Sequence, residues 1–330
     1  MKKLDLLKRR VFLAASLSVL IVTAIMAVGF YQTVFAAEAK PVAPIVQKTF
    51  KSSEEAAKSL MDAVKSNDTK QLLAIFGPAG KDLVSSGDEV ADKAGREQFV
   101  KDYEEKSNLE KETDNKVALV VGNREWPFPI PIVKKGETWV FGTMAGKEEL
   151  LNRRIGRNEL DTIQTCLAYV DAQREYAMKD RDSDKVREYA QRFGSTKGRK
   201  DGLYWEAKEG EEQSPLGSLA AQAVREGYKG RKPGDKPSPY HGYFYRILKA
   251  QGKNAPGGAY DYVVNGKMIG GFALVAYPAE YGASGIMTFV VNHDGVVYQK
   301  DLGKETGKVA SAMTKYDPDK TWEQVEEPKK

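Results

Sequence analysis

The chain has 330 residues with 51 basic and 46 acidic side chains, and five of the basic and one of the acidic ones fall within residues 1–36. Residues 37–330 therefore carry 46 basic against 45 acidic side chains, a balance that offers no electrostatic attraction for a nucleic-acid partner. Cys166 is the only cysteine, which excludes a disulfide within the chain, so its stability must come from packing.

Residues 1–36 have the pattern of a signal peptide. Basic residues between Lys2 and Arg10 precede an almost wholly apolar run from Val11 to Phe30, and residues 34–36 offer the small side chain that a signal peptidase accepts. This pattern predicts a protein that is periplasmic or secreted after cleavage. The apolar run approaches the ~20 residues that cross a bilayer, so an inner-membrane anchor formed by residues 11–30 is the alternative and the only membrane contact that we expect.

Two export routes fit this segment. Residues 8–13, with the sequence KRRVFL, resemble a twin-arginine signal, which exports proteins that have already folded. The strong hydrophobicity that follows favours the general route for unfolded chains instead. Residues 37–48, which include Pro41 and Pro44, then predict an extended linker to the folded region.

Residues 49–150 predict an N-terminal α+β domain. Ser52 and Glu55 form a capping box that begins the first helix, and Asn67-Asp68 caps a second helix that ends at Gly77-Pro78. The predicted helices are residues 53–66, a segment through residues 72–76 and one around residues 99–103, and the predicted strands are 117–121, 130–133 and 138–141. Helices followed by strands favour helices that cover one face of an antiparallel sheet.

Residues 151–325 predict a second α+β domain, in which a long helix packs on an antiparallel meander. Leu160, Ile163, Leu167 and Val170 form one apolar stripe on a helix over residues 158–178. The sequence then predicts a short helix over 186–193 and a long loop over 194–240 with a helix near 219–224. The predicted strands that follow are 243–248, 260–264, 271–276, 287–291 and 296–300, and a closing helix is predicted near 308–313. Residues 326–330 are expected to be a disordered tail.

Several motifs resemble known families. The helix–loop–helix opening and the strand that begins at residues 136–139 are similar to domains of the nuclear-transport-factor-2-like fold. Residues 169–193 and 270–302 resemble an exported bacterial family known as domain of unknown function family 2950, and this resemblance extends over residues 49–322. The family implies export but no assigned activity.

The second half is also similar to the globular headgroup of type II secretion pseudopilins. The motifs are Ala172-Gln173 with Tyr176 on a helix, then Ala276-Tyr277-Pro278, Gly285–Phe289 and Asp294-Gly295-Val296 in the sheet. The hydrophobic first half of a pilin helix is missing before Asn158. The resemblance therefore implies the shape of a headgroup and does not imply a pilus.

Three carboxylates at alternating positions indicate a cation site. Asp180, Asp182 and Asp184 have the spacing by which a calcium loop directs oxygens to one centre, and Glu188 is a fourth candidate ligand. Lys185 stands at the sixth loop position where the EF-hand consensus has glycine, so a solvated acidic turn is the alternative.

His241 is the centre of an aromatic candidate binding site. It follows Tyr240 and precedes Tyr243 and Tyr245, at the exit of the long loop, and aromatic walls suit sugars or peptides. The alternative is that these rings fill the two faces of a strand.

Catalytic patterns are few in this sequence. Cys166 lies in the long helix, where we expect a buried structural thiol. Carboxylate pairs such as Glu209 with Glu211 are of the type that glycoside hydrolysis uses, but the separation that this reaction requires is a matter of geometry that sequence does not show. We therefore expect an exported envelope protein that is a noncatalytic binding or structural module, with an envelope protein or polysaccharide as partner. The alternative is a hydrolase of a cell-wall or extracellular polymer that uses loop 194–240 with His241.

Overall fold

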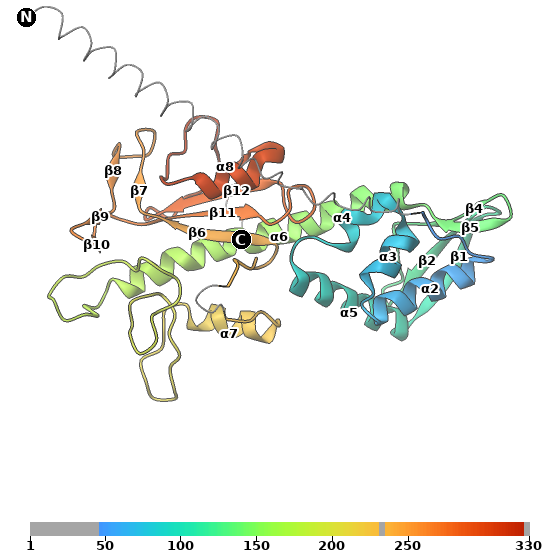
Figure 1. Cartoon of the computed structure of the whole chain (residues 1–330), viewed down its shortest axis with the longest axis horizontal. Coiled ribbons are helices and arrows are strands. Elements are labelled where there is room, and N and C mark those ends of the chain that lie inside the picture. Colours follow the sequence, from blue (N-terminus) through green and yellow to red (C-terminus); the bar gives the residue numbers. More distant parts are fainter. Residues whose placement is uncertain (1–45, 231–234, 327–330) are drawn as a thin grey trace, which may run out of the picture. The chain divides into compact units, whose positions relative to one another are not determined.

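The protein is a mixed α+β chain in which helices pack on antiparallel sheets, as predicted (Figure 1). Its structure is a computed structural model that describes residues 46–230 and 235–326. The predicted signal peptide and anchor, nearly all of the predicted linker and residues 327–330 of the predicted tail lie outside these ranges. Within them, none of the helices is both long and apolar enough to cross a bilayer.

Short helices open the described chain. They are α2 (Ser53–Lys65), α3 (Thr69–Phe76), the 3-10 turn η1 (Pro78–Gly80), α4 (Lys81–Val84) and α5 (Glu89–Glu105). The predicted caps form, because Ser52 Oγ accepts a hydrogen bond from the Glu55 backbone N–H and Asp68 accepts from the N–H groups of Lys70 and Gln71.

The first sheet has the order β1-β2-β4-β5, and β3 also pairs with β2. Its antiparallel strands are β1 (Ser107–Thr113), β2 (Lys116–Val121), β3 (Trp126–Pro127), β4 (Ile132–Lys135) and β5 (Thr138–Phe141). Strand β1 is absent from the sequence prediction because its side chains are mostly polar and exposed and so lack an apolar alternation. One face of this sheet and helices α2 and α3 share an apolar core that includes Phe50, Leu60, Ile75, Leu119 and Phe141.

Helix α6 (Thr143–Tyr176) connects the two sheets without a break. The prediction that this helix begins near Asn158 is wrong, since it starts at Thr143. Gly146 and Gly156 lower helix propensity in its first half, and that half offers few apolar side chains at helical spacing. Its first half reaches the first core through Leu150, and its second half contributes Cys166, Tyr169 and Val170 to a second core.

The segment after α6 is irregular where the sequence predicts a helix over residues 186–193. The buried amide of Gln173 explains this difference, because its Oε1 accepts from the Ala190 N–H and its Nε2 donates to the Ala190 carbonyl, both at 2.8 Å. Tyr189 pairs with Met268 by a single bridge. The backbone groups of this segment therefore find partners without a helical ladder. The predicted helix in the long loop forms as α7 (Gly217–Arg225).

The second sheet has the antiparallel order β14-β13-β12-β11-β6. Its strands are β6 (Tyr243–Leu248), β11 (Ala273–Pro278), β12 (Met287–Asn292), β13 (Val297–Asp301) and β14 (Glu323–Gln324). Two short ladders stand beside it, β7 (Ala250–Gln251) with β8 (Tyr260–Asp261) and β9 (Val263–Val264) with β10 (Lys267–Met268). Figure 1 shows α6 on one side of this sheet and α8 (Thr306–Ala312), which follows η2 (Gly303–Glu305), on the other.

Glu212 anchors the irregular loop to the end of α6. Its carboxylate accepts hydrogen bonds from Lys179 at 2.7 Å, Lys200 at 2.8 Å and Arg181 at 2.9 Å. The guanidinium of Arg181 lies over the ring of Trp205 at 5.1 Å. These three cations, Lys179 first, lower the pKa of Glu212 to about 2.

Removal of the Glu212 charge is expected to destabilise the protein at neutral pH but not at strongly acidic pH. Glu212→Gln should lower the free energy of unfolding by about 1 kcal/mol at neutral pH, a modest figure because the cluster is partly open to screening by solvent. The folded pKa lies below the unfolded value, so the stabilisation is present above the unfolded pKa and is lost as the pH falls toward about 2. Urea unfolding of both proteins across this range measures the difference, and a difference that stays constant down to the acid end would contradict the assignment.

Candidate functional site

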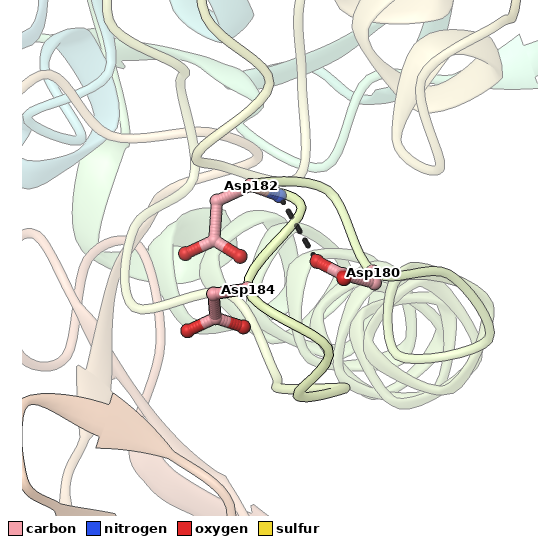
Figure 2. A group of neighbouring side chains, drawn as sticks. All are labelled: Asp180, Asp182 and Asp184. Carbon is pink, nitrogen blue, oxygen red and sulfur yellow. Dashed lines mark hydrogen bonds between the residues drawn. The ribbon is translucent and has the colours of Figure 1, made fainter.

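The three aspartates of the predicted cation loop lie close together (Figure 2). One carboxylate oxygen of each of Asp180, Asp182 and Asp184 lies within 4.8 Å of the others, and all three residues are exposed. Asp180 also organises the turn, because its oxygens accept from the backbone N–H groups of Ser183 at 2.8 Å and Lys185 at 2.7 Å. These backbone bonds, that of Lys185 first, lower the pKa of Asp180.

Lys267 neutralises part of this acidic loop. Its Nζ lies 2.9 Å from Asp182 Oδ2 and 3.5 Å from Glu188 Oε1, and it also pairs with Asp184. The pKa of Lys267 is raised, and the largest cause is its hydrogen bond to Asp184. A calcium ion bound by these carboxylates would therefore compete with an ammonium group that already contacts three of the four predicted ligands.

We expect removal of Lys267 to strengthen any calcium binding by this loop. In Lys267→Gln, millimolar calcium should raise the Tm more than it does in the unchanged protein, because binding to the folded state stabilises it and the competing cation is gone. Differential scanning fluorimetry with and without calcium measures this shift. The exposed Lys253, replaced by glutamine, is the charge control, and equal shifts in the two variants would rule the site out.

A cavity of about 550 Å³ lies beside α5, remote from the acidic loop in the sequence. Helices α2 to α6 and the first sheet contribute to its wall, together with Glu226, Tyr228 and His241. Its apolar part includes Val64, Leu72, Phe76, Val84, Phe99 and Phe128. Most of these side chains belong to the first core, so the cavity is an opening in that core toward α6 and the long loop.

Helix α5 forms one wall of the cavity and does not close over the core. It has 17 residues, yet none of them is buried. Val90, Ala91 and Phe99 on its inner face line the cavity. A helix of this length normally buries an apolar stripe, so we attribute the merely partial burial of Val90, Ala91 and Phe99 to the open space beneath them.

Three arginines line the same cavity. Arg154 donates from Nη1 to the carbonyl oxygen of Asp82 at 2.7 Å and from Nη2 to that of Leu83 at 2.6 Å, while Arg96 donates to the carbonyl of Val84. These two guanidiniums thus cap the C-terminal end of α4. Arg157 is exposed on α6 at the cavity wall.

His241 lies at the polar side of the cavity between two carboxylates. Its Nε2 is 2.7 Å from Glu226 Oε2, and its Nδ1 is 3.3 Å from Asp161 Oδ2 without hydrogen-bond geometry. Burial opposes ionisation of Glu226, but hydrogen bonds from Gln222 and His241 outweigh it and lower the pKa of that carboxyl. The histidine has a left-handed backbone with φ of 50°, which is uncommon for a residue with a side chain.

A buried carboxylate fixes this strained position. Asp88 Oδ2 accepts from the Gly242 N–H at 2.8 Å and from the Tyr228 hydroxyl at 2.9 Å, and that hydroxyl accepts from the His241 N–H. Asp88 Oδ1 accepts from the first N–H groups of α5, including that of Val90. Asp88 therefore couples the start of α5 to the segment that carries His241.

Of the four predicted aromatic-site residues, His241 alone lines the cavity. Tyr240 stacks on His241 with ring centroids 4.1 Å apart. Tyr243 is fully buried and its hydroxyl donates to the Met287 carbonyl at 3.0 Å, while Tyr245 donates to Thr162 Oγ1 at 3.3 Å. Tyr243 and Tyr245 thus belong to the packing of β6 against α6. This arrangement matches the alternative stated for the aromatic site, in which the rings fill the faces of a strand.

The other candidates stay apart from the cavity wall. Cys166 is buried in the second core, and burial raises the pKa of its thiol to about 12, which fits a structural thiol. Glu209 and Glu211 are exposed in a turn, where Glu211 accepts from the Lys208 N–H. Asp88, Arg154 and Arg157 were not predicted from the sequence. Asp88 could have been found, because an aspartate directly before a helical run is typical of an N-cap.

A family model described as "Protein of unknown function (DUF2950)" matches residues 47–325. The chain belongs to this family. The match covers both sheets and the cavity, and it confirms the resemblance predicted from the motifs in the second half. No curated protein and no solved structure matches the chain, so the pseudopilin-like and nuclear-transport-factor-2-like resemblances stay predictions.

Proposed function

We propose that the protein is a noncatalytic binding module of the cell envelope, whose cavity beside α5 holds a small molecule. The observation that supports it is the cavity itself, whose volume of about 550 Å³ lies within the range of about 300–1,000 Å³ common to small-molecule sites. Such sites combine apolar walls with a few polar groups, and this cavity has both. The signal-peptide pattern of residues 1–36 supports a place outside the cytoplasm.

The polar groups of the cavity support binding over reaction. Arg96 and Arg154 line the cavity and donate hydrogen bonds to carbonyl groups at the end of α4. Asp88 does not line the cavity, and its carboxylate accepts four hydrogen bonds from backbone and tyrosine partners. Groups that hold the fold in place are poorly suited to move during catalysis. The apolar inner wall also favours a compact ligand over the envelope protein or polysaccharide that the sequence suggested.

Gly95 offers a way to fill the cavity without damage to the fold. It lies in the middle of α5 on the cavity wall, and a Cβ built at this position meets no atom within 4 Å. Gly95→Trp should therefore fold and place a large ring in the space of the ligand. Gly95→Ala is the matched control, since it leaves the cavity open and is expected to stabilise α5 by about 0.5–1 kcal/mol.

The test uses N-phenylnaphthylamine, an uncharged dye that fluoresces in apolar sites. We expect saturable binding of one dye per chain in the unchanged protein and in Gly95→Ala, and a loss of at least about tenfold in affinity in Gly95→Trp, because the ring excludes the dye. Thermal unfolding of each variant verifies the fold. Equal dye binding by the tryptophan and alanine variants would refute the proposal.

The hydrolase alternative is favoured by one arrangement. His241, the loop carboxylate Glu226 and Asp161 converge on one cavity, as a general acid–base pair would require. A hydrolase would release soluble fragments from purified cell-wall material, and that release should disappear in His241→Ala and in Glu226→Gln. Release that survives both substitutions would exclude this mechanism.

A further inference from the structure

We infer that the cavity binds a single-chain amphiphile with an anionic head group, held by the arginines at its wall with its apolar chain inside. This inference rests on the proposed function and adds the chemical class of the ligand. It combines two features of one cavity, an apolar interior and a group of guanidiniums whose charges are not balanced by ion pairs.

The first support is the state of the three arginines. Among the described residues, none of Arg96, Arg154 and Arg157 has a carboxylate within ion-pair distance. Arg96 donates to the Asn67 amide oxygen and a carbonyl, and Arg154 donates to carbonyls alone. Carbonyl oxygens satisfy the donors but carry no net charge. Guanidiniums without a directly paired carboxylate are suited to bind an anion.

The second support is the electrostatic environment of Arg154. Its side chain is partly buried, and burial, first, lowers the pKa of its guanidinium; the positive charges of Arg157 and Arg96 lower it further. Asp92 and Asp82 act in the opposite direction. An anionic head group would add a favourable charge beside these arginines.

Four acidic side chains line the same cavity as the three arginines. Asp161 and Glu226 face His241, which lies between them. Asp92 accepts from the Ser86 N–H at 2.9 Å, and Asp102 accepts from the Gln98 amide at 2.7 Å. None of these four carboxylates forms an ion pair with an arginine of the cavity, although the neutral donors of Asp92 and Asp102 leave the charges of these two carboxylates in place.

The third support is the apolar wall, which extends from α5 to the first sheet. Phe76, Phe99, Trp126 and Phe128 contribute aromatic surface, and ring pairs such as Phe99 with Phe128, at 5.5 Å between centroids, form a continuous lining. A hydrocarbon chain buried there gains about 0.8 kcal/mol per methylene. A free phosphate or a short organic acid would leave this surface in contact with water, which favours the amphiphile.

The test compares three ligands with the same chain: dodecanoate, dodecyl phosphate and dodecanol, each below its micelle concentration. Each competes with N-phenylnaphthylamine for the protein. We expect at least one of the anions to displace the dye at a concentration about tenfold to hundredfold lower than dodecanol does, because hydrogen bonds to a charged group are strong. The anion that binds more tightly identifies the head group as carboxylate or phosphate.

Two variants link this preference to the arginines. Arg157→Gln should remove most of the advantage of the anions and leave the displacement by dodecanol unchanged, whereas Arg187→Gln, an exposed arginine outside the cavity wall, should leave the advantage intact. Equal competition by all three ligands, or an anion advantage that persists in Arg157→Gln, overturns the inference. Since the dye itself is uncharged, its binding tests the proposed function independently of this result.

Discussion

Replacement of Asp88 by alanine is expected to lower the free energy of unfolding by about 3–7 kcal/mol. The substitution removes an N-cap, worth about 1 kcal/mol. It also leaves the buried Gly242 N–H and the Tyr228 hydroxyl without their acceptor, at about 1–3 kcal/mol for each such group. Asp88 is 1% exposed, so water cannot easily replace the lost carboxylate.

Asp68 provides the matched control for this prediction. It is the N-cap of α3, but its carboxylate is exposed and bonds only to the first turn of its own helix. Asp68→Ala should therefore destabilise the protein clearly less than Asp88→Ala does. Urea unfolding followed by circular dichroism gives both values, and similar costs for the two substitutions would show that Asp88 acts as an ordinary helix cap and does not couple α5 to the His241 segment.

Gly146→Ala is the second large effect that we expect, with a cost of about 3 kcal/mol. Gly146 is buried on α6 where the helix crosses the loop before β4, and a Cβ there would lie 2.1 Å from the Pro129 carbonyl oxygen and 2.7 Å from the Ile130 nitrogen. Both contacts are with backbone, so relief requires a shift of the helix or the loop. Ile130 lines the cavity, so dye binding should weaken as well.

Gly156 distinguishes steric crowding from a change in helix propensity. It lies on the same helix, but a Cβ there meets no atom within 4 Å. Gly156→Ala should therefore stabilise the protein by about 0.5–1 kcal/mol. The two alanine variants, compared by thermal unfolding, are expected to shift the Tm in opposite directions, and a shift of the same sign in both would contradict the close approach of α6 to residues 129–130.

Local signals in the sequence were enough to predict most elements of the fold. The capping box at Ser52 and Glu55 and the predicted strands at 287–291 and 296–300 lie where α2, β12 and β13 form. The missed elements depend on distant contacts. The first half of α6 is stabilised against Ile130 and its neighbours, and the irregular segment near Ala190 is held by the Gln173 side chain.

The site was less accessible to sequence interpretation than the fold. His241 was predicted because its neighbours are aromatic, yet the cavity that it lines forms from segments far apart in the chain: Asp88 contacts Gly242 across 154 residues. The acidic loop shows the same limit. The spacing of Asp180, Asp182 and Asp184 is visible in the sequence, but Lys267, which pairs with two of these aspartates, lies 85 residues beyond Asp182.

The most direct test of the cavity as a binding site is quenching of Trp126. This side chain lines the cavity, and a bromine atom quenches tryptophan only at close range. Titration with ω-bromododecanol and ω-bromododecanoate should produce saturable quenching that disappears in Trp126→Phe and weakens in Gly95→Trp after correction for the added ring. Quenching that is unaffected by the loss of Trp126, or absent at saturating ligand, would contradict binding in this cavity.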